Sequence, residues 1–362
     1  MASREIIIVT TTLGNDGAER ILTELSNEWV RTGNQVTVVQ THPSVDESAY
    51  ASDDRVEKID IRVPRKNGVQ WYLDEIKEVV KLLKTRPDAV VLAFLSRSFY
   101  IVSIASFFVK NKIVFSERND PSRWPAKKSH RILRNLAFLR ADACVFQTAE
   151  AMSYFPKIVQ KKGVIIPNPC NPNLPQRYRG TRRKAIVSAS RLTKQKNLPM
   201  LIRAFFKFHK EFPEYQLEIY GEGEERETLE STVHSLGLDE FVSLPGFAKN
   251  IHEIMVDCAM YVCSSDYEGI SNSMLEALGM GVPVISTDCP VGGAREMIQS
   301  GINGLLVHVG DEETLYESMK LLASDSALAE KLSMNACAIR ENYHIARIAS
   351  KWLDVFQEST KK

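Results

Sequence analysis

Met260-Tyr261-Val262-Cys263-Ser264 is an apolar run, and it is followed by a polar loop, by Asn272-Ser273-Met274-Leu275-Glu276-Ala277-Leu278-Gly279 and by Val284-Ile285-Ser286. The first and last of these stretches predict short buried strands, and the middle one predicts a helix. A strand, a helix and a second strand at this spacing indicate a βαβ unit, which belongs to parallel sheets with helices on both faces.

The same alternation extends along all 362 residues. Strands are predicted at 5–10, 35–40, 89–94, 112–115, 143–146 and 164–166, and again at 185–190, 216–220, 242–244, 260–264, 284–286 and 305–307. Helical patterns lie between them at 17–32, 71–84, 198–211, 224–236 and 272–279. We therefore expect an α/β fold of two doubly wound parallel-sheet domains that face each other across a cleft.

A proline-rich segment separates the two halves. Pro167-Asn168-Pro169-Cys170-Asn171-Pro172-Asn173-Leu174-Pro175 can continue neither a helix nor a central strand. We expect a first domain at 1–170, a linker at 171–184 and a second domain at 185–342. The final segment, 343–362, contains a helical pattern at 344–358 with Trp352 on its apolar face.

Composition excludes several classes of protein. Hydrophobic residues make up 44% of the chain and charged residues 25%, which excludes a disordered chain. No apolar run approaches the ~18 residues that cross a bilayer, and no cleavage site follows the first apolar run, so we expect neither a span nor a signal peptide. The six cysteines favour buried thiols in a reducing cytosol, with a metal site at Cys258 and Cys263 as the alternative.

Charge is divided unevenly along the chain. Residues 1–180 contain 27 basic and 19 acidic residues, and residues 181–362 contain 19 basic and 26 acidic residues. A basic first half fits an anionic ligand, an anionic membrane surface or nucleic acid. No RNA-binding motif of interleaved aromatic and basic residues accompanies this charge, so we expect no nucleic-acid partner.

The loop and helix start after the strand at 260–264 form the first candidate ligand site. Residues 269–271 stand at the expected helix N-terminus, where unpaired N–H groups bind anions. Glu268 and Glu276 are eight residues apart, so both carboxylates can accept hydrogen bonds from the hydroxyl groups of one ligand. The alternatives are a capping box formed by Ser273 and Glu276, and a solvated loop acid at Glu268.

Two further loops carry candidate phosphate contacts. Arg191 and Lys196 follow the strand at 185–190, and a guanidinium and an ammonium bind phosphate well. A solvated basic loop is the alternative. Gly14 and Gly17 lie between the first strand and the first helix, but without a third glycine they do not predict a dinucleotide site, and a tight turn is the alternative.

The segment 123–140 contains six basic residues and no acidic residue. Ile132, Leu133 and Leu136 recur at helical spacing, which predicts a basic amphipathic helix suited to an anionic membrane or a polyphosphate ligand. A packed helix with a solvated basic face is the alternative. The residues expected to contact a membrane or an acceptor here are Lys127, Lys128, Arg131 and Arg134.

Together these stretches resemble the retaining nucleotide-sugar glycosyltransferases of family 4, whose GT-B architecture pairs two Rossmann-like domains. The resemblance covers nearly the whole chain. It rests on the order of Gly17-Ala18-Glu19-Arg20, Ser116-Glu117-Arg118-Asn119, Pro167-Asn168-Pro169, Arg191-Leu192 with Lys196-Asn197, Gly221-Glu222-Gly223, Leu244-Pro245-Gly246 and Glu268-Gly269 with Glu276-Ala277-Leu278-Gly279. The block from Glu268 to Glu276 is the most specific of these motifs.

The resemblance implies a metal-independent transfer from a UDP-sugar, with no cofactor required. Arg191 and Lys196 would hold the donor diphosphate, Glu268 would bind the donor sugar and Glu276 would bind the ribose. The catalytic residues implied are Arg191, Lys196 and Glu268. No Asp-x-Asp motif occupies the site region, so the two basic residues would replace a divalent ion. The other residues implied in donor binding are Gly14, Gly17, Gly246, Phe247, Gly269, Ile270 and Ser271.

The acceptor implied is a glycan, in particular one linked to polyprenyl diphosphate, in bacterial surface-polysaccharide or glycan synthesis. The segment 123–140 resembles the membrane-facing basic helix of such transferases, which implies a cytoplasmic enzyme at the inner face of the plasma membrane. Family members often carry His where this chain has Arg118. Arg118 therefore has three open roles, namely contact with the sugar or acceptor, phosphate binding and structural packing.

Two other functions fit parts of the pattern. A nucleotide-sugar epimerase shares the GT-B fold but would need its own acid–base residues in the cleft. A non-catalytic two-domain protein that binds a phosphate ligand would use the basic half alone, and its affinity would fall steeply with salt. The second alternative leaves the block from Glu268 to Glu276 unexplained.

Overall fold

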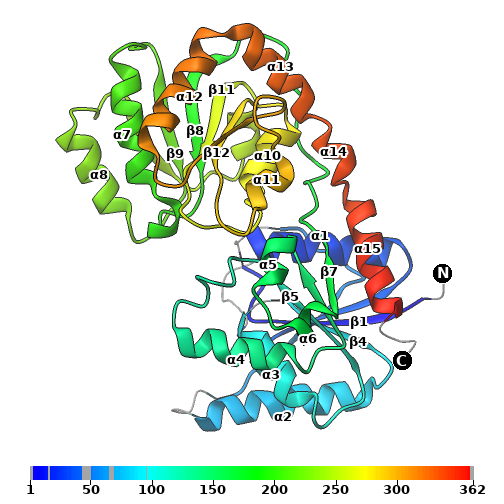
Figure 1. Cartoon of the computed structure of the whole chain (residues 1–362). Coiled ribbons are helices and arrows are strands. Elements are labelled where there is room, and N and C mark those ends of the chain that lie inside the picture. The colour runs from blue at the N-terminus through cyan, green and yellow to red at the C-terminus, as the bar shows by residue number, and fades with distance from the viewer. Residues whose placement is uncertain (1–2, 15–16, 43–49, 65–68, 95, 359–362) are drawn as a thin grey trace. The chain divides into compact units, whose positions relative to one another are not determined.

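The computed structural model describes residues 3–14, 17–42, 50–64, 69–94 and 96–358. The chain divides into two compact units (Figure 1). Unit 1 contains residues 1–169 and 345–362, and unit 2 contains residues 170–344. Asn15 and Asp16, between Gly14 and Gly17 in the sequence, lie outside the described residues.

Unit 1 alternates strands and helices, as its apolar runs predict. Its strands are β1 (Glu5–Thr10), β2 (Gln35–Gln40), β3 (Glu57–Asp60), β4 (Val90–Ala93), β5 (Lys112–Glu117), β6 (Ala143–Phe146) and β7 (Gly163–Ile165). Its helices are α1 (Gly17–Arg31), α2 (Val69–Thr85), α3 (Ser96–Ala105), α4 (Lys128–Phe138), α5 (Ala149–Ser153), α6 (Lys157–Gln160) and α15 (Ile345–Glu358).

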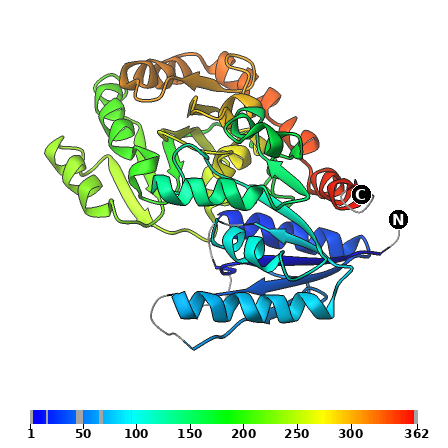
Figure 2. The same cartoon turned by 60° about the horizontal axis from the view of Figure 1, so that its bottom comes forward.

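In the described part of unit 1, the strands form a seven-stranded parallel sheet of order β3-β2-β1-β4-β5-β6-β7. Helices α2 and α3 lie on one face and α1 lies on the other (Figure 2). The last helix packs on α1, where the Trp29 and Trp352 rings meet edge to face with centroids 6.3 Å apart. The order reverses between β1 and β4, so the carboxyl ends of these strands are the expected place for a ligand.

Unit 2 repeats the alternation. Its strands are β8 (Arg183–Ala189), β9 (Gln216–Tyr220), β10 (Val242–Gly246), β11 (Cys258–Cys263), β12 (Val284–Thr287) and β13 (Leu305–Val307). Its helices are the short 3-10 turn η1 (Lys194–Lys196), α7 (Leu198–His209), α8 (Arg226–Ser235), α9 (Ile251–Met255), α10 (Asn272–Gly279), α11 (Gly293–Met297), α12 (Glu312–Ser324), α13 (Ser326–Ala336) and α14 (Ile339–Asn342).

The six strands described in unit 2 form a parallel sheet of order β10-β9-β8-β11-β12-β13. Successive side chains of β11 point into the cores on opposite faces of the sheet. Met260 and Val262 pack with α7 and α12, whereas Tyr261 packs with α10. Burial on both faces explains why this strand reads as a continuous apolar run. The order reverses between β8 and β11, which marks the carboxyl edge of these strands as the ligand-binding edge.

The predicted α/β class with two Rossmann-like parallel sheets is confirmed. The strands expected at 5–10, 35–40, 143–146, 216–220 and 305–307 and the helix expected at 272–279 have the predicted bounds. Strand β3 and helix α3 are among the elements that were not predicted. Strand β3 is a short and mostly exposed edge strand without an apolar run, and α3 is buried on most sides, so its sequence lacks a clear helical period.

Candidate functional site

The candidate site of unit 2 lies where the loops after β8 and β11 meet. The loop after β8 carries Arg191 and continues into η1, which ends at Lys196. The loop after β11 carries Glu268 and leads into α10. Because β8 and β11 are neighbours at the reversal of strand order, the two loops are placed side by side by the sheet.

Lys196 and Glu268 form an ion pair in which the Lys196 ammonium donates to Glu268 Oε1. Both side chains are largely buried. Burial by itself lowers the pKa of Lys196, but attraction to the Glu268 carboxylate outweighs it and leaves this pKa above its ordinary value. The lysine is therefore charged at neutral pH, and the structure brings together two residues that the sequence only suggested as partners in one site.

A network of hydrogen bonds holds the two loops in register. Gln195 donates from Nε2 to the Tyr267 carbonyl at 2.8 Å, and the Asp266 N–H donates to the Gln195 carbonyl at 2.8 Å. Asn197 adopts a left-handed conformation with φ of 43° and donates to Asp266 Oδ1 at 2.7 Å. These contacts fix the backbone on both sides of the Lys196–Glu268 pair.

Arg191 is exposed at the end of β8. The loop that bears it packs closely on two glycines, because a Cβ on Gly221 would lie 1.9 Å from the Ser190 carbonyl oxygen and one on Gly223 would lie 2.3 Å from that of Leu192. Larger residues would displace the loop. These glycines therefore support the loop that carries the guanidinium.

The N-terminus of α10 faces the same edge of the sheet. Ser271 is its N-cap, and the Ser271 hydroxyl accepts the Met274 N–H at 3.5 Å. Gly269 and Ile270 are buried just before it, and a Cβ on Gly293 would lie 1.8 Å from the Gly269 carbonyl oxygen. This first turn presents N–H groups and the positive end of a helix dipole.

Glu276 is buried within α10 and pairs with a residue that the sequence did not single out. His252 Nε2 lies 2.8 Å from Glu276 Oε2. Because the N-cap is Ser271, the alternative of a capping box between Ser273 and Glu276 is wrong. His252 lies on α9, 24 residues before Glu276, and no spacing in the sequence connects the two; only the packing of α9 against α10 does.

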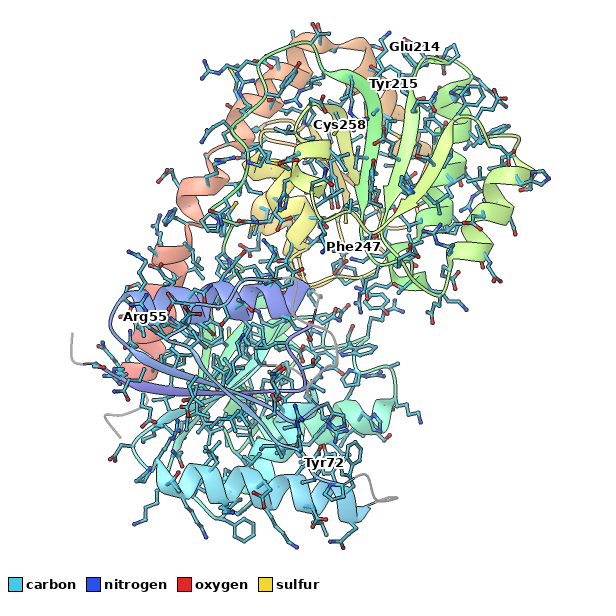
Figure 3. The ribbon with its side chains drawn as sticks, turned by 180° about the vertical axis from the view of Figure 1, so that it is seen from behind. Arg55, Tyr72, Glu214, Tyr215, Phe247 and Cys258 are labelled. Atoms are coloured by element: carbon cyan, nitrogen blue, oxygen red, sulfur yellow. The ribbon has the colours of Figure 1, made fainter. Side chains whose placement is uncertain are left out.

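Gly246 and Phe247 end strand β10 and begin the next loop. Gly246 has φ of 89°, and a Cβ there would lie 2.7 Å from Glu222 Oε1, so glycine suits the position. The Phe247 side chain is 57% exposed and projects from the end of the strand (Figure 3). An exposed ring at this edge is free to lie against a planar base.

The glycines expected to approach the donor from unit 1 lie at the end of its first strand. Gly14 follows β1, and Gly17 opens α1. The Leu13 N–H donates to Gln40 Oε1 at 2.7 Å, which ties the residue before Gly14 to the end of β2. The contact of Gly14 and Gly17 with a donor remains a prediction.

Arg118 is held by partners within unit 1. It donates from Nη1 to the Ile166 carbonyl at 2.9 Å and from Nη2 to Asn168 Oδ1. Its guanidinium lies 5.8 Å from the centroid of the Trp352 ring. Burial lowers the pKa of Arg118 to about 9, with Glu117 opposing, so the residue stays charged. These contacts give it a packing role; its contact with an acceptor or a phosphate stays a prediction.

Arg134 corrects one expectation. Its side chain is fully buried, and it donates to Glu117 Oε2 at 3.2 Å, to the Trp124 carbonyl at 2.6 Å and to the Pro121 carbonyl at 2.9 Å. The prediction that Arg134 contacts a membrane or an acceptor is therefore wrong for the structure described. The helical period places it on the inward face of α4, where a buried acid pairs with it.

The other residues singled out on the basic segment are accessible. Lys127 and Lys128 are exposed, whereas Arg131 is half-buried and donates to the carbonyls of Pro125 and Ala126 at 2.9 and 2.7 Å.

Among the residues described, no helix has the length and apolar character needed to cross a bilayer. In that same part of the chain, no three His, Cys, Asp or Glu side chains gather in a way that could hold a metal ion.

Two Rossmann-like units, each with a parallel sheet, are the architecture of the GT-B fold, which the chain shares with a solved structure. The model for "Glycosyltransferase Family 4" matches residues 15–174, and the model for "Glycosyl transferases group 1" matches residues 173–338. The chain belongs to the family 4 type of GT-B glycosyltransferases, and it is an enzyme of this kind.

Two relatives come from Campylobacter jejuni subsp. jejuni serotype O:2. N-acetylgalactosamine-N,N'-diacetylbacillosaminyl-diphospho-undecaprenol 4-alpha-N-acetylgalactosaminyltransferase is 31% identical over 277 residues, 72% of this chain and 74% of the relative. GalNAc-alpha-(1->4)-GalNAc-alpha-(1->3)-diNAcBac-PP-undecaprenol alpha-1,4-N-acetyl-D-galactosaminyltransferase is 25% identical over 361 residues, 98% of each chain. A crystal structure of Anabaena Alr3699/HepE with UDP and glucose aligns with a TM-score of 0.83 at 19% identity, covering 98% of this chain and 99% of that one.

Proposed function

We propose that this enzyme transfers a hexose or an N-acetylhexosamine from a UDP-sugar to a lipid-linked glycan, with retention of anomeric configuration and without a metal ion. The observation that carries the proposal is the convergence of Lys196, Glu268 and the N-terminus of α10 at one edge of the sheet. The structure of HepE with UDP and glucose, which has the same fold, supports a UDP-sugar donor.

The chemistry proposed for this edge is electrostatic. When the bond between the sugar carbon and the diphosphate oxygen breaks, negative charge develops on the departing UDP. Lys196, Arg191 and the N–H groups at the start of α10 would stabilise that charge without reorganisation. A departing phosphate oxygen would accept the proton of the attacking hydroxyl on the same face of the sugar, so the new bond would form with retention and without a covalent enzyme intermediate.

The two carboxylates have different proposed tasks. Glu276 is held by His252 and lies inside α10, where it would accept hydrogen bonds from the ribose hydroxyls. Glu268 lies in the loop before α10, next to Lys196, where it would contact the transferred sugar. Ser265 donates to Glu268 Oε1 at 3.3 Å and helps to orient it.

This division of tasks predicts two different binding defects. Glu276→Ala is expected to weaken UDP and every UDP-sugar by about tenfold or more, because hydrogen bonds to a charged group are lost. Glu268→Ala is expected to leave UDP binding unchanged and to abolish transfer. Thermal shifts with a panel of nucleotide sugars measure both, since ligand at a hundredfold over Kd adds roughly 2.7 kcal/mol to stability.

The panel is run in EDTA, with hydrolysis of each nucleotide sugar as a second readout and Glu240→Ala as the matched control, since the exposed Glu240 lies just before β10, at the opposite edge of the sheet. A wild-type protein that UDP does not stabilise would refute the proposed donor. If Glu268→Ala weakened UDP as much as the sugar nucleotide, the roles assigned to the two carboxylates would be wrong.

The surface of α3 and α4 supports a lipid-linked acceptor. Five large apolar side chains there are each more than half exposed: Phe107, Phe108, Ile132, Leu133 and Leu136. Helices α3 and α4 pack together, and the guanidinium of Arg140, just after α4, lies 4.2 Å from the centroid of the Phe107 ring. We call these five residues the α3–α4 face. Exposed apolar surface of this kind marks a membrane or partner site.

The charges around the α3–α4 face favour an anionic membrane as the partner. In the continuously described stretch 96–141, the acidic residues Glu117 and Asp120 are both buried. The exposed charges in the same stretch are all basic: Lys110, Arg123, Lys127, Lys128 and Arg140. We therefore propose that the enzyme works at the cytoplasmic face of the plasma membrane and inserts the α3–α4 face between anionic lipids.

Membrane binding is expected to depend on insertion as well as on charge. Phe107→Ser combined with Leu136→Gln should lower the affinity for phosphatidylglycerol vesicles by about tenfold or more, because each buried apolar side chain contributes roughly 1.5 to 3 kcal/mol. Lys127→Glu combined with Lys128→Glu should lower it strongly near 0.15 M salt and little at about 1 M salt, where charges are screened within about 3 Å. Vesicle co-sedimentation of the full chain measures both.

Met334→Gln, which replaces an exposed apolar residue of unit 2, is the matched control and should bind like the wild type. Vesicles of phosphatidylcholine alone should bind weakly. Equal sedimentation of the wild type and the Phe107→Ser, Leu136→Gln protein would reject the α3–α4 face as the anchor without affecting the donor assignment.

A further inference from the structure

A second group of charged and aromatic side chains lies in unit 1, apart from the residues assigned above. Its centre is the carboxylate of Glu75 on α2, which is fully buried. Arg97 donates from Nη2 to Glu75 Oε2 at 2.6 Å, and His42 Nδ1 lies 3.3 Å from Glu75 Oε1. Arg97 and His42 are each about one quarter exposed, so both reach the surface from a buried anchor.

The fold collects these residues at the ligand-binding edge of the unit 1 sheet. His42 follows the end of β2, and Arg97 lies in the first turn of α3, just after β4. Glu75 lies in the second turn of α2, the helix that follows β3. In the order β3-β2-β1-β4, the carboxyl ends of these strands surround that of β1, which is where an open parallel sheet of this order binds its ligands.

Aromatic rings form one wall of the group. The His42 ring packs against the Trp71 ring with the two centroids 4.6 Å apart. The Arg97 guanidinium also lies 4.6 Å from the centroid of the Trp71 ring. The same guanidinium lies 5.0 Å from the centroid of Tyr72, in the first turn of α2 (Figure 3). Both rings are partly exposed. A partly exposed aromatic wall beside polar groups is the usual surface for the apolar faces of a small polar ligand.

The hydrogen bonding of the group is incomplete. Among the described residues, the buried Arg97 Nε has no hydrogen-bond partner, and Glu75 Oε1 accepts no hydrogen bond of good geometry although His42 Nδ1 lies 3.3 Å from it. A buried charge with unfilled hydrogen-bonding capacity costs stability, and packing alone gives no reason to keep it. The group is therefore better explained by a ligand that the exposed parts of Arg97 and His42 contact, with Glu75 as the positioning residue that holds both.

The charges of the group decide what kind of ligand fits. The Arg97 cation and the Glu75 anion cancel, so the group has little net attraction for a phosphate. It offers donors on Arg97 and His42 next to an aromatic wall, which suits the hydroxyl groups and the apolar face of a neutral sugar. We propose that His42, Arg97 and Trp71 form a subsite for a sugar of the acceptor glycan, which rests on the transferase function proposed above.

The test compares His42→Gln and Arg97→Met in the full-length protein with UDP present. Saturation-transfer NMR uses octyl α-N-acetylgalactosaminide and octyl α-glucoside as neutral probes and octyl phosphate as an anionic probe. Each variant is expected to lower the signal of the better-bound glycoside about tenfold, as for the loss of a hydrogen bond to a charged group. His42→Gln leaves the Arg97–Glu75 pair intact, so its effect does not depend on the stability of that pair.

Arg55→Met is the matched control, because Arg55 is an exposed arginine of the same unit whose ion pair with Asp53 lies at the surface. Transfer kinetics add a second readout: both test variants should raise KM for the acceptor and leave the UDP-induced thermal shift unchanged.

Unchanged glycoside signals in both variants, no signal from the wild type, or preferential binding of octyl phosphate would each overturn the subsite. If UDP failed to stabilise the wild type while the variants still lost glycoside binding, the proposed donor chemistry would fail and the subsite would stand.

Discussion

Lys196→Ala is expected to lower kcat/KM for the UDP-sugar by about 10²- to 10³-fold, the loss found when one preorganised group that stabilises developing negative charge is removed. The ammonium is largely buried and held by Glu268, so it has a fixed position and little water to screen it. Its raised pKa keeps it charged throughout the neutral range. Initial rates of UDP release at varied donor concentration give the value.

Removing Lys196 also leaves the Glu268 carboxylate without its cation. Lys196→Met combined with Glu268→Gln removes both charges and isolates the effect on stability: stability should return, while activity stays low because both side chains are proposed to take part in transfer. Lys207→Ala is the control, because Lys207 is a partly exposed lysine of the same unit that pairs with Glu312 and Glu313. Losses of equal size in Lys196→Ala and Lys207→Ala would rule out the proposed stabilisation of the leaving group.

Arg134→Leu is expected to destabilise unit 1 by about 3 to 5 kcal/mol, the cost of breaking a buried ion pair from one side. Burial raises the pKa of Glu117, and Arg134 opposes that shift, so without the arginine a buried carboxylate is left uncompensated. The guanidinium also lies 4.8 Å from the centroid of Phe155 and donates to two carbonyls before α4. Thermal unfolding should shift down by roughly 6 to 20 °C.

The double variant Arg134→Leu, Glu117→Gln should regain much of the stability lost in Arg134→Leu. Replacing both members of a buried ion pair costs far less stability than leaving one buried charge unpaired. Lys128→Leu, on the same helix but exposed, should change stability by no more than about 0.5 kcal/mol. A loss below about 1 kcal/mol in Arg134→Leu would show that the pair does not hold α4 in place.

Glu268 and Glu276 show how far sequence reasoning reached into the site. Their spacing around an expected helix start predicted one carboxylate before the helix and one within it, and the structure has this arrangement. The spacing did not predict which residues pair with the two carboxylates. Lys196 is 72 residues away from Glu268 and His252 is 24 residues away from Glu276, so only the packing of loops and helices brings each pair together.

The segment around α4 shows the opposite case. Its composition predicted a basic helix, but composition does not say which way a side chain turns. The helical period turns Arg134 inward to Glu117 and leaves Leu133 and Leu136 outside, so the exposed face is apolar as well as basic. The group of His42, Glu75 and Arg97 had no signal in the sequence, because its members come from three separate places in the chain: the end of β2, α2 and the start of α3.

The sequence by itself determined the two parallel sheets, since a strand buried on both faces must be apolar along its length and a crossover must be a helix. It also determined which loops follow strands and carry charge. The tertiary structure decided which charges are buried, which are paired and which face the solvent. These depend on contacts between residues far apart in the chain, and burial changes the free energy of a charge more than any local pattern does.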